Sequence, residues 1–214
     1  MRSFALPLLV LLSLATPGWA QANCLDQIKV PQQGRWAEYR ALYKDDPYTV
    51  RYAVIGNEAR GAKNLQWVEM RMTGVTKDRN MIFQILVPGS LTELSKVQEV
   101  IFKPGDQPAM RVSGAMVNML RSQLEKELLF SRICNGVTLV GKEKVAVPAG
   151  DFEVLHFRSA EPVTDSWVSP GVPFSLVKSA GKNYQVELAA EGSGAKSSIT
   201  EKPQEMGGIG GPSH

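Results

Sequence analysis

The stretch that decides the fold runs from Tyr48 to Val87 and holds three segments, YTVRYAV (48–54), LQWVEMRMT (65–73) and MIFQILV (81–87). In the first two, neighbouring side chains alternate between two faces, a period of two that is typical of half-buried β-strands. A turn is predicted at 56–61. Because such short connections cannot make parallel crossovers, we predict an antiparallel meander.

More strands are predicted on both sides of a central helical segment. Residues 97–102 are β-branched and aromatic, and a return strand is expected at 107–112 after the turn Pro104-Gly105-Asp106. Glycine and proline then punctuate short apolar segments, which predicts strands at 138–147, 152–159, 166–169, 175–179, 184–190 and 196–200. Strands at such regular intervals indicate an antiparallel sheet or barrel.

Two segments have the spacing of helices. The main helix is expected from Ser113 to Arg132, where the following apolar residues fall on one stripe: Met116, Met119, Leu120, Leu124 and Leu128. A short N-terminal helix, or a helix-to-strand transition, is expected over 34–44. Its apolar residues are three to four positions apart: Trp36, Tyr39, Leu42 and Tyr43.

Residues 1–20 have the pattern of a cleavable secretory signal peptide. Arg2 precedes an apolar run from Phe4 to Ala15, and the small residues Gly18 and Ala20 stand at positions −3 and −1 of the cleavage site. The apolar run is shorter than the about 20 residues that a spanning helix needs, which disfavours an uncleaved anchor. We predict cleavage near Ala20 and export to the periplasm or beyond the cell, with no stable transmembrane anchor.

Cys24 and Cys134 are the only cysteines in the sequence. In an oxidising compartment an even pair favours one disulfide, and two free thiols are the alternative. Cys24 also invites a lipoprotein interpretation, but Gln21 and Asn23 before it fit a lipidation signal poorly. We therefore predict a Cys24–Cys134 bridge in a chain that is not lipidated.

The composition is that of one ordinary globular domain. Of the chain, 43% is hydrophobic and 21% is charged, as in folded soluble domains. The formal net charge of +3 falls by one when Arg2 is removed, and so small an excess argues against a nucleic-acid partner. We predict a single domain over 21–203 and a flexible glycine-rich tail over 204–214.

The chain carries no recognised catalytic motif. It has no G-x-S-x-G nucleophile elbow, no P-loop, no H-E-x-x-H and no G-x-G-x-x-G after a strand. His156 lies in a predicted strand, where a lone histidine is usually a packing or surface residue, so a hydrolase using it is a distant alternative. The two cysteines and two histidines have no metal-ligand spacing. We expect a protein that is not an enzyme and has no catalytic residues, cofactor or metal.

A resemblance adds to this interpretation. The segment GKEKVAVPAGDF (141–152), followed by HFR (156–158), WVS (167–169) and VPFSLVK (172–178), resembles a group of exported bacterial proteins that looks related to the lipoprotein-localisation-factor (LolA/LolB-like) superfamily. PGDQPAM (104–110) also fits that group. The resemblance covers the chain roughly from Trp36 to Thr200, and its motifs mark strands and turns rather than a reactive site.

The resemblance implies a mainly-β, α+β fold. It would be a curved, incomplete antiparallel β-barrel with the main helix and a short N-terminal helix across its open face. Carriers of that superfamily hold the acyl chains of lipoproteins in the concave face and do no chemistry. This chain lacks a convincing lipidation signal, unlike the membrane-anchored receptors of that superfamily.

We therefore expect a monomeric exported protein that binds an apolar ligand in its concavity. The ligand would be a lipid, an acyl chain or a lipoprotein, and flexible methionine side chains suit such a cavity. The expected lining is Trp67, Met70, Met72, Met81, Met116, Met119 and Leu120. The alternative is a structural or interaction protein of the cell envelope with a filled core and no small ligand.

Overall fold

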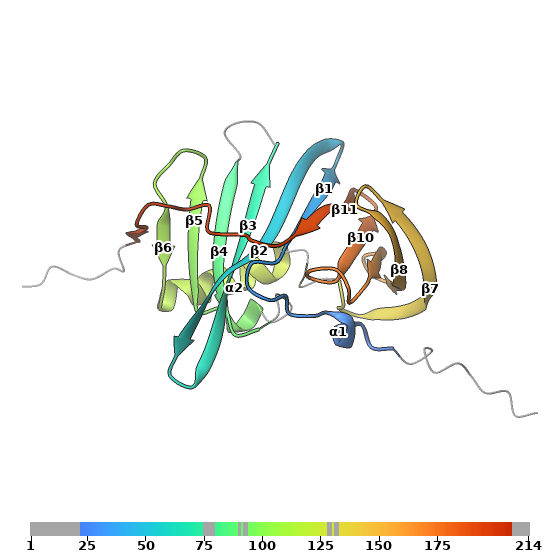
Figure 1. Ribbon diagram of the computed structural model, residues 1–214, viewed down its shortest axis with the longest axis horizontal. Helices are drawn as coiled ribbons and strands as arrows, with labels where there is room; N and C mark the ends of the chain where they lie inside the picture. Colours follow the sequence, from blue (N-terminus) through green and yellow to red (C-terminus); the bar gives the residue numbers. More distant parts are fainter. Residues whose placement is uncertain are drawn as a thin grey trace, which may run out of the picture.

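Twelve strands form one curved, open sheet in the order β12-β6-β5-β4-β3-β2-β1-β11-β10-β9-β8-β7 (Figure 1). The computed structural model describes residues 22–74, 80–89, 91, 94–127, 130 and 133–206, without the side chains of 122, 123 and 125–127. Neighbouring strands pair antiparallel, apart from β12, which lies parallel to β6. The predicted signal peptide and residues 207–214 of the predicted tail lie outside the described residues.

The first meander of the sheet consists of the six strands before the helix. Their bounds are β1 Trp36–Tyr43, β2 Asp46–Arg60, β3 Lys63–Thr73, β4 Met81–Val87, β5 Glu99–Pro104 and β6 Met110–Val112. The second meander follows the helix. Its bounds are β7 Val137–Val147, β8 Gly150–Ser159, β9 Thr164–Val168, β10 Leu176–Gly181 and β11 Tyr184–Gly192. The short strand β12 spans Gln204–Glu205.

The seam between the two meanders is the pairing of β1 with β11, from Trp36↔Gly192 to Tyr43↔Tyr184. The helix expected over 34–44 is wrong, because this segment is strand β1. Ala37, Tyr39 and Ala41 are its buried residues. These three positions have the period of two of a strand, but two of them are small alanines, so the larger apolar side chains alone do not show that period. The turn expected over 56–61 is also wrong, because β2 continues through a bulge near Gly56 and turns only at Gly61.

The predicted main helix is confirmed over Ala115–Glu127, which is α2, whereas Leu128 of the expected stripe lies outside the described residues. The helix lies behind the sheet, at the lower ends of β4 to β6 in Figure 1. Val117 and Leu124 are buried against the sheet, and the Arg121 guanidinium donates two hydrogen bonds to the carbonyl of Val97. The 3₁₀ turn η3, Leu94–Lys96, lies beside the helix. The N-terminal helix is a single turn, α1 Cys24–Gln27, which begins before the expected segment.

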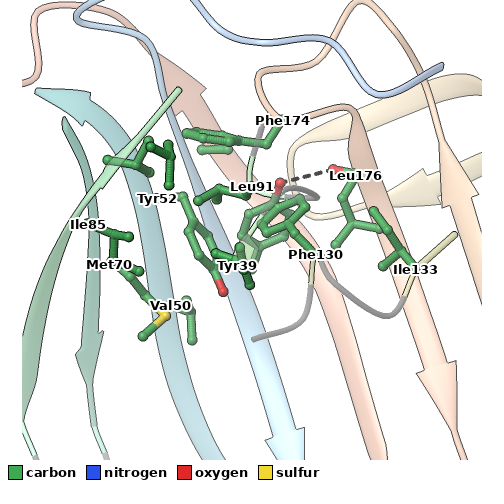
Figure 2. Packing of buried hydrophobic residues seen from close by; sticks show 14 of the residues in the cluster. Tyr39, Val50, Tyr52, Met70, Ile85, Leu91, Phe130, Ile133, Phe174 and Leu176 are labelled. Carbon is green, nitrogen blue, oxygen red and sulfur yellow. Dashed lines mark hydrogen bonds between the residues drawn. The ribbon is translucent and has the colours of Figure 1, made fainter. Parts of the chain in front are cut away.

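The core is built around aromatic side chains from both halves of the chain (Figure 2). The Tyr52 ring lies 4.8 Å from that of Phe130 and 5.8 Å from that of Phe174, measured between centroids. The hydroxyl of Tyr39, fully buried, donates a hydrogen bond of 3.1 Å to the carbonyl of Leu176. This hydrogen bond satisfies a buried polar group and ties β1 to β10.

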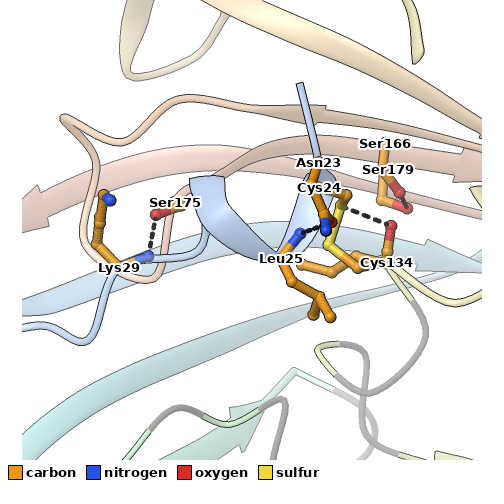
Figure 3. Close-up of a disulfide and its surroundings, with 9 residues drawn as sticks. Asn23, Cys24, Leu25, Lys29, Cys134, Ser166, Ser175 and Ser179 are labelled. Atoms are coloured by element: carbon orange, nitrogen blue, oxygen red, sulfur yellow. Dashed lines mark hydrogen bonds between the residues drawn. A yellow bond between two sulfur atoms is a disulfide. The ribbon is translucent and has the colours of Figure 1, made fainter. Parts of the chain in front are cut away.

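The predicted disulfide between Cys24 and Cys134 is present (Figure 3). It joins α1 to the segment before β7, and Cys24 is buried with Phe157 and Val168. Lys29 donates its backbone N–H to Ser175 Oγ at 2.9 Å, which fixes the segment after α1. Because the bridge occupies the Cys24 sulfur, this atom carries no lipid in the described structure.

The strand expected over 196–200 is wrong. Residues 195–203 instead cross the face of the sheet that is turned away from α2 (Figure 1). We call them the C-terminal strap. The strap starts with a hydrogen bond from Ala195 N to Gly34 O and ends with one from Gln204 N to Ala109 O. The structure also moves the expected start of the tail, since Gln204 and Glu205 form β12.

Candidate functional site

Two cross-strand rows of apolar side chains lie on the core-facing side of the first meander. One row runs Tyr52–Met70–Phe83–Phe102–Met110, and the other runs Val50–Met72–Met81–Pro104. Residues directly opposite each other on paired strands share one face. The rows therefore form one continuous apolar surface across β2 to β6.

Burial divides this surface into a covered end and a partly exposed end. Toward α2 and η3 its residues are buried: Val68, Ile85, Val87, Val100 and Val112. At the other end Pro104 and five methionine or phenylalanine side chains are only partly buried; the five are Met72, Met81, Phe83, Phe102 and Met110. We call these five residues the methionine–phenylalanine surface. Contiguous apolar side chains that keep some exposure are candidates for an interaction site.

The predicted lining is divided between three places. Met70, Met72 and Met81 are in the two apolar rows, and Met116 and Leu120 of α2 pack against the same core. Trp67 points to the opposite face of the sheet, because it alternates with Val68 and Met70 along β3. Met119 lies on the outer side of α2 with 77% of its surface exposed. The structure thus removes Trp67 and Met119 from this lining.

Phe83, Phe102 and Met110 are the residues that the sequence reasoning missed. The rings of Phe83 and Phe102 lie 6.5 Å apart between centroids. The signal was present in the alternation of MIFQILV, where Met81, Phe83 and Ile85 share a face. The sequence does not show, however, which residues of β5 and β6 lie opposite Phe83, and the register of these strands is needed to join Phe102 and Met110 to it.

The region beneath Phe130 is closely packed rather than hollow. A cavity of about 10 Å³ lies there between Val68, Leu91, Phe130 and Phe174. That volume is about one water-sized probe. The space beneath the aromatic core therefore has no room for an apolar ligand.

His156 lies in a second cluster, on β8. Its ring stacks on Trp167 of β9, with centroids 4.6 Å apart and an interplanar angle of 19°. Nδ1 lies 3.1 Å from Glu143 Oε1, and Nε2 lies 2.6 Å from Asp165 Oδ1. Both ring nitrogens therefore face carboxylates, and neither is directed at a serine, threonine or cysteine, as a general base for a nucleophile would be.

Arg158 completes this cluster by donating Nε–H to Asp165 Oδ1 at 2.7 Å. The pKa of the Asp165 carboxyl lies below its ordinary value. Burial raises that pKa, but the hydrogen bonds and positive charges of Arg158 and His156 lower it by more than burial raises it. In the described residues, no group of three or more His, Cys, Asp or Glu side chains is arranged to hold a metal ion.

The opposite face of the first meander is unusually polar for a covered surface. Glu69, Gln84 and Glu99 are all buried there, at 2%, 5% and 4% exposure. The Trp67 indole donates Nε1–H to Glu58 Oε2 at 2.8 Å. Hydrogen bonds from Arg60 and from Trp67 hold the pKa of the Glu58 carboxyl below its ordinary value.

No helix within the described ranges has both the length and the apolar character needed to cross a membrane. No protein-family model matches the chain, and a search of curated proteins finds no match.

Solved structures do resemble the chain. One is a protein from Bacteroides fragilis assigned as exported and as having a YmcC-like fold, with a TM-score of 0.39 and 11% identity over 78% of this chain and 99% of that one. Another is a protein from Parabacteroides distasonis assigned as a lipoprotein, with a TM-score of 0.40 and 11% identity over 77% and 97% of the two chains. Because scores and identities are low, we base the function on this chain's own residues.

Proposed function

We propose that this protein is a monomeric, exported, non-enzymatic carrier that holds an apolar ligand on the methionine–phenylalanine surface. The ligand is an acyl chain, either of a free lipid or of a lipidated protein. The observation that carries the proposal is the pair of apolar rows whose ends, beyond α2, remain partly exposed.

The chemistry of the surface suits an acyl chain. Met72, Met81 and Met110 have flexible, polarizable side chains that adapt to irregular apolar ligands. Phe83 and Phe102 offer flat apolar area between them. None of these five side chains carries a charge that could pair with a polar ligand. Binding would therefore be driven by the hydrophobic effect, the removal of apolar surface from water.

Export is supported by the signal-like pattern of residues 1–20 and by the Cys24–Cys134 bridge. Disulfides persist in oxidising compartments such as the periplasm. The absence of catalysis is supported by the engagement of both His156 nitrogens with Glu143 and Asp165.

A second candidate function is an envelope interaction protein that takes no small ligand. The close packing around Tyr52, Phe130 and Phe174 favours it, because this part of the core leaves no room for a ligand. In that case the methionine–phenylalanine surface would be covered by a protein partner.

Uptake of lipid separates the two candidates. Protein purified from the periplasm is examined by native mass spectrometry for bound lipid and is titrated with a fluorescent fatty acid. The carrier proposal expects saturable uptake. The variant M81Q places an amide in the exposed end of the row and should weaken binding about tenfold, the effect of losing about 1.5 kcal/mol of apolar burial.

The matched control is M119Q, because Met119 is a methionine of α2 that is 77% exposed and outside the surface. It should bind the fatty acid as the wild type does. Protein that carries no lipid and takes up no fatty acid would refute the carrier proposal and favour the interaction protein. Equal weakening by both variants would refute the assignment of the surface.

A further inference from the structure

A group of hydrogen-bond donors lies on the polar face of the first meander, beside the C-terminal strap. It consists of three arginines and two threonines from β1, β2 and β3: Arg40, Thr49, Arg51, Arg71 and Thr73. Thr49 lies opposite both Arg40 and Thr73. Arg51, two positions further along β2, lies opposite Arg71. The five side chains therefore share one face of the sheet, and we call them the basic patch.

The basic patch is accessible and its polar groups are unused. Arg40 is exposed and the other four residues are partly exposed. The strap leaves them uncovered because it crosses the next row of the sheet, at Glu69 and Gln84. Within the described part of the chain, no side chain of the patch makes a hydrogen bond or an ion pair. Three guanidinium groups and two hydroxyls are thus available to a ligand.

One of these guanidinium groups is held in place without an ion pair. That of Arg51 lies over the Trp36 ring, 4.4 Å from the ring centroid. The ring is fixed in turn, because Trp36 Nε1–H donates a hydrogen bond to the carbonyl of Ser193 at 3.2 Å. Stacking on an aromatic face leaves the N–H groups in the guanidinium plane free to bind an anion. Arg51 therefore presents its donors in a defined orientation.

The pair of Arg51 and Arg71 calls for an anion. Like charges directly opposite each other on paired strands are destabilising. An anion between the two guanidinium groups would replace this repulsion by attraction. Guanidinium groups match phosphate in particular, because two parallel N–H groups can bind two of its oxygens.

The carboxylates beside the basic patch are mostly engaged elsewhere. Glu187, opposite Arg40, accepts a hydrogen bond from Lys178 Nζ at 2.8 Å. Glu69 accepts hydrogen bonds from the strap. Glu38, opposite Arg51, makes no hydrogen bond or ion pair with a described residue. The three arginines therefore have one free carboxylate beside them, and the patch keeps an excess of positive charge.

The basic patch and the methionine–phenylalanine surface lie at the same end of the strands. Arg71 directly precedes Met72 in β3, so the two side chains point to opposite faces at that end. A membrane that meets this end of the sheet can contact cations on one face and apolar side chains on the other.

We propose that the basic patch binds the phosphate groups of anionic phospholipids and so docks the protein on a membrane surface. This inference rests on the carrier proposal, because it names the membrane as the place where the acyl ligand is exchanged. Phosphate is the group that uses both kinds of donor, since its several oxygens accept from guanidinium and hydroxyl groups alike.

Flotation of the mature chain with vesicles tests the inference. The vesicles contain either phosphatidylcholine alone or equal parts of phosphatidylcholine and phosphatidylglycerol. We expect binding to the anionic vesicles only, and release at an ionic strength of about 1 M, where the Debye length is about 3 Å. No binding to the anionic vesicles, or equal binding to both kinds, would overturn the proposal. Release by millimolar glycerol phosphate at constant ionic strength would assign the patch to a soluble phosphate and overturn the membrane assignment.

The variant R40Q/R71Q removes two positive charges of the basic patch. Each cation near an anionic bilayer strengthens binding about fivefold, so the partition coefficient should fall about thirtyfold. The matched control is K142Q/K144Q, which removes two charges from β7, where both lysines are more than half exposed. The control should bind the vesicles as the wild type does. Equal weakening by both double variants would show an effect of net charge alone and overturn the assignment to the patch.

E38Q changes the binding in the opposite direction, because it removes the free carboxylate beside Arg51. It should strengthen binding to the anionic vesicles about fivefold. Unchanged or weaker binding by E38Q would contradict the role of the patch, and this variant keeps the test decisive if R40Q/R71Q does not fold.

Failure of the docking proposal is distinguishable from failure of the carrier proposal, because the uptake of fatty acid is measured without vesicles. R40Q/R71Q should take up fatty acid as the wild type does. Wild-type protein that takes up fatty acid but does not bind anionic vesicles would overturn the docking alone. Vesicle binding without uptake of fatty acid would overturn the carrier alone.

Discussion

The buried carboxylate of Glu69 should hold the C-terminal strap on the sheet, and E69Q should release much of that stabilisation. Glu69 is 2% exposed, and its two oxygens accept hydrogen bonds from Ser198 N, Ser198 Oγ and Gln84 Nε2. The variant has the same shape but lacks the charge. Its amide nitrogen would also face groups that donate hydrogen bonds.

The expected loss follows from these contacts. A hydrogen bond to a charged group contributes about 1.5–3 kcal/mol, whereas a neutral one contributes about 0.5–1.5 kcal/mol. A loss of about 1 kcal/mol at each contact lowers the free energy of unfolding by about 3 kcal/mol. By contrast, a substitution on an exposed strand face usually changes it by no more than about 0.5 kcal/mol.

Urea unfolding followed by tryptophan fluorescence measures the change. The matched control is E153Q on β8, where the glutamate is 71% exposed, and it should stay close to the wild type. A double-mutant cycle of E69Q with S198A should give a coupling energy of about 1 kcal/mol or more, since the two residues touch. A change in E69Q no larger than in E153Q would refute this role of Glu69.

Two further predictions concern the bridge and the second meander. The double variant C24S/C134S should lower the free energy of unfolding by about 2–5 kcal/mol, because the bridge closes a loop spanning 110 residues. Urea unfolding measures this, and reduction of the wild type should reproduce it; a change below about 1 kcal/mol contradicts it. Because the folded pKa of Asp165 is lowered, its stabilisation is complete above the ordinary value of 3.8 and is lost as the pH falls through the folded pKa. The unfolding free energies of wild type and D165N should therefore converge as the pH falls below the ordinary value of 3.8, and a constant difference would show that the ion pairs do not matter.

The strands and the helix could be predicted because their patterns are local. The bounds of β4 agree with the predicted segment 81–87, since MIFQILV is a continuous apolar segment that Pro88-Gly89 ends. The disulfide was predicted from composition and compartment alone. The helix over 34–44 was wrong because Ala37 and Ala41 occupy the buried face of the strand. The larger apolar residues Trp36, Tyr39 and Leu42 are therefore divided between its two faces and have a helical spacing by coincidence.

The candidate site could be predicted only in part, because it depends on register. Met70, Met72 and Met81 were assigned to one lining, and pairing does place them on a shared face. Trp67 was named in the lining although it alternates with Met70 along its strand, because the sequence does not show which face of the strand is turned toward α2. The strap gave no local signal, since Glu69 and Ser198 are 129 residues apart in the chain.

The seam between β1 and β11 has a consequence for how the chain folds. Each meander consists of contacts between neighbours in sequence, which form quickly, whereas the seam joins strands from opposite ends of the chain. The first meander can therefore assemble before the second, with the edge of β1 unpaired. A bare strand edge is a template for association with other chains. The interval before residues 184–192 pair with β1 is thus when this protein is most exposed to aggregation.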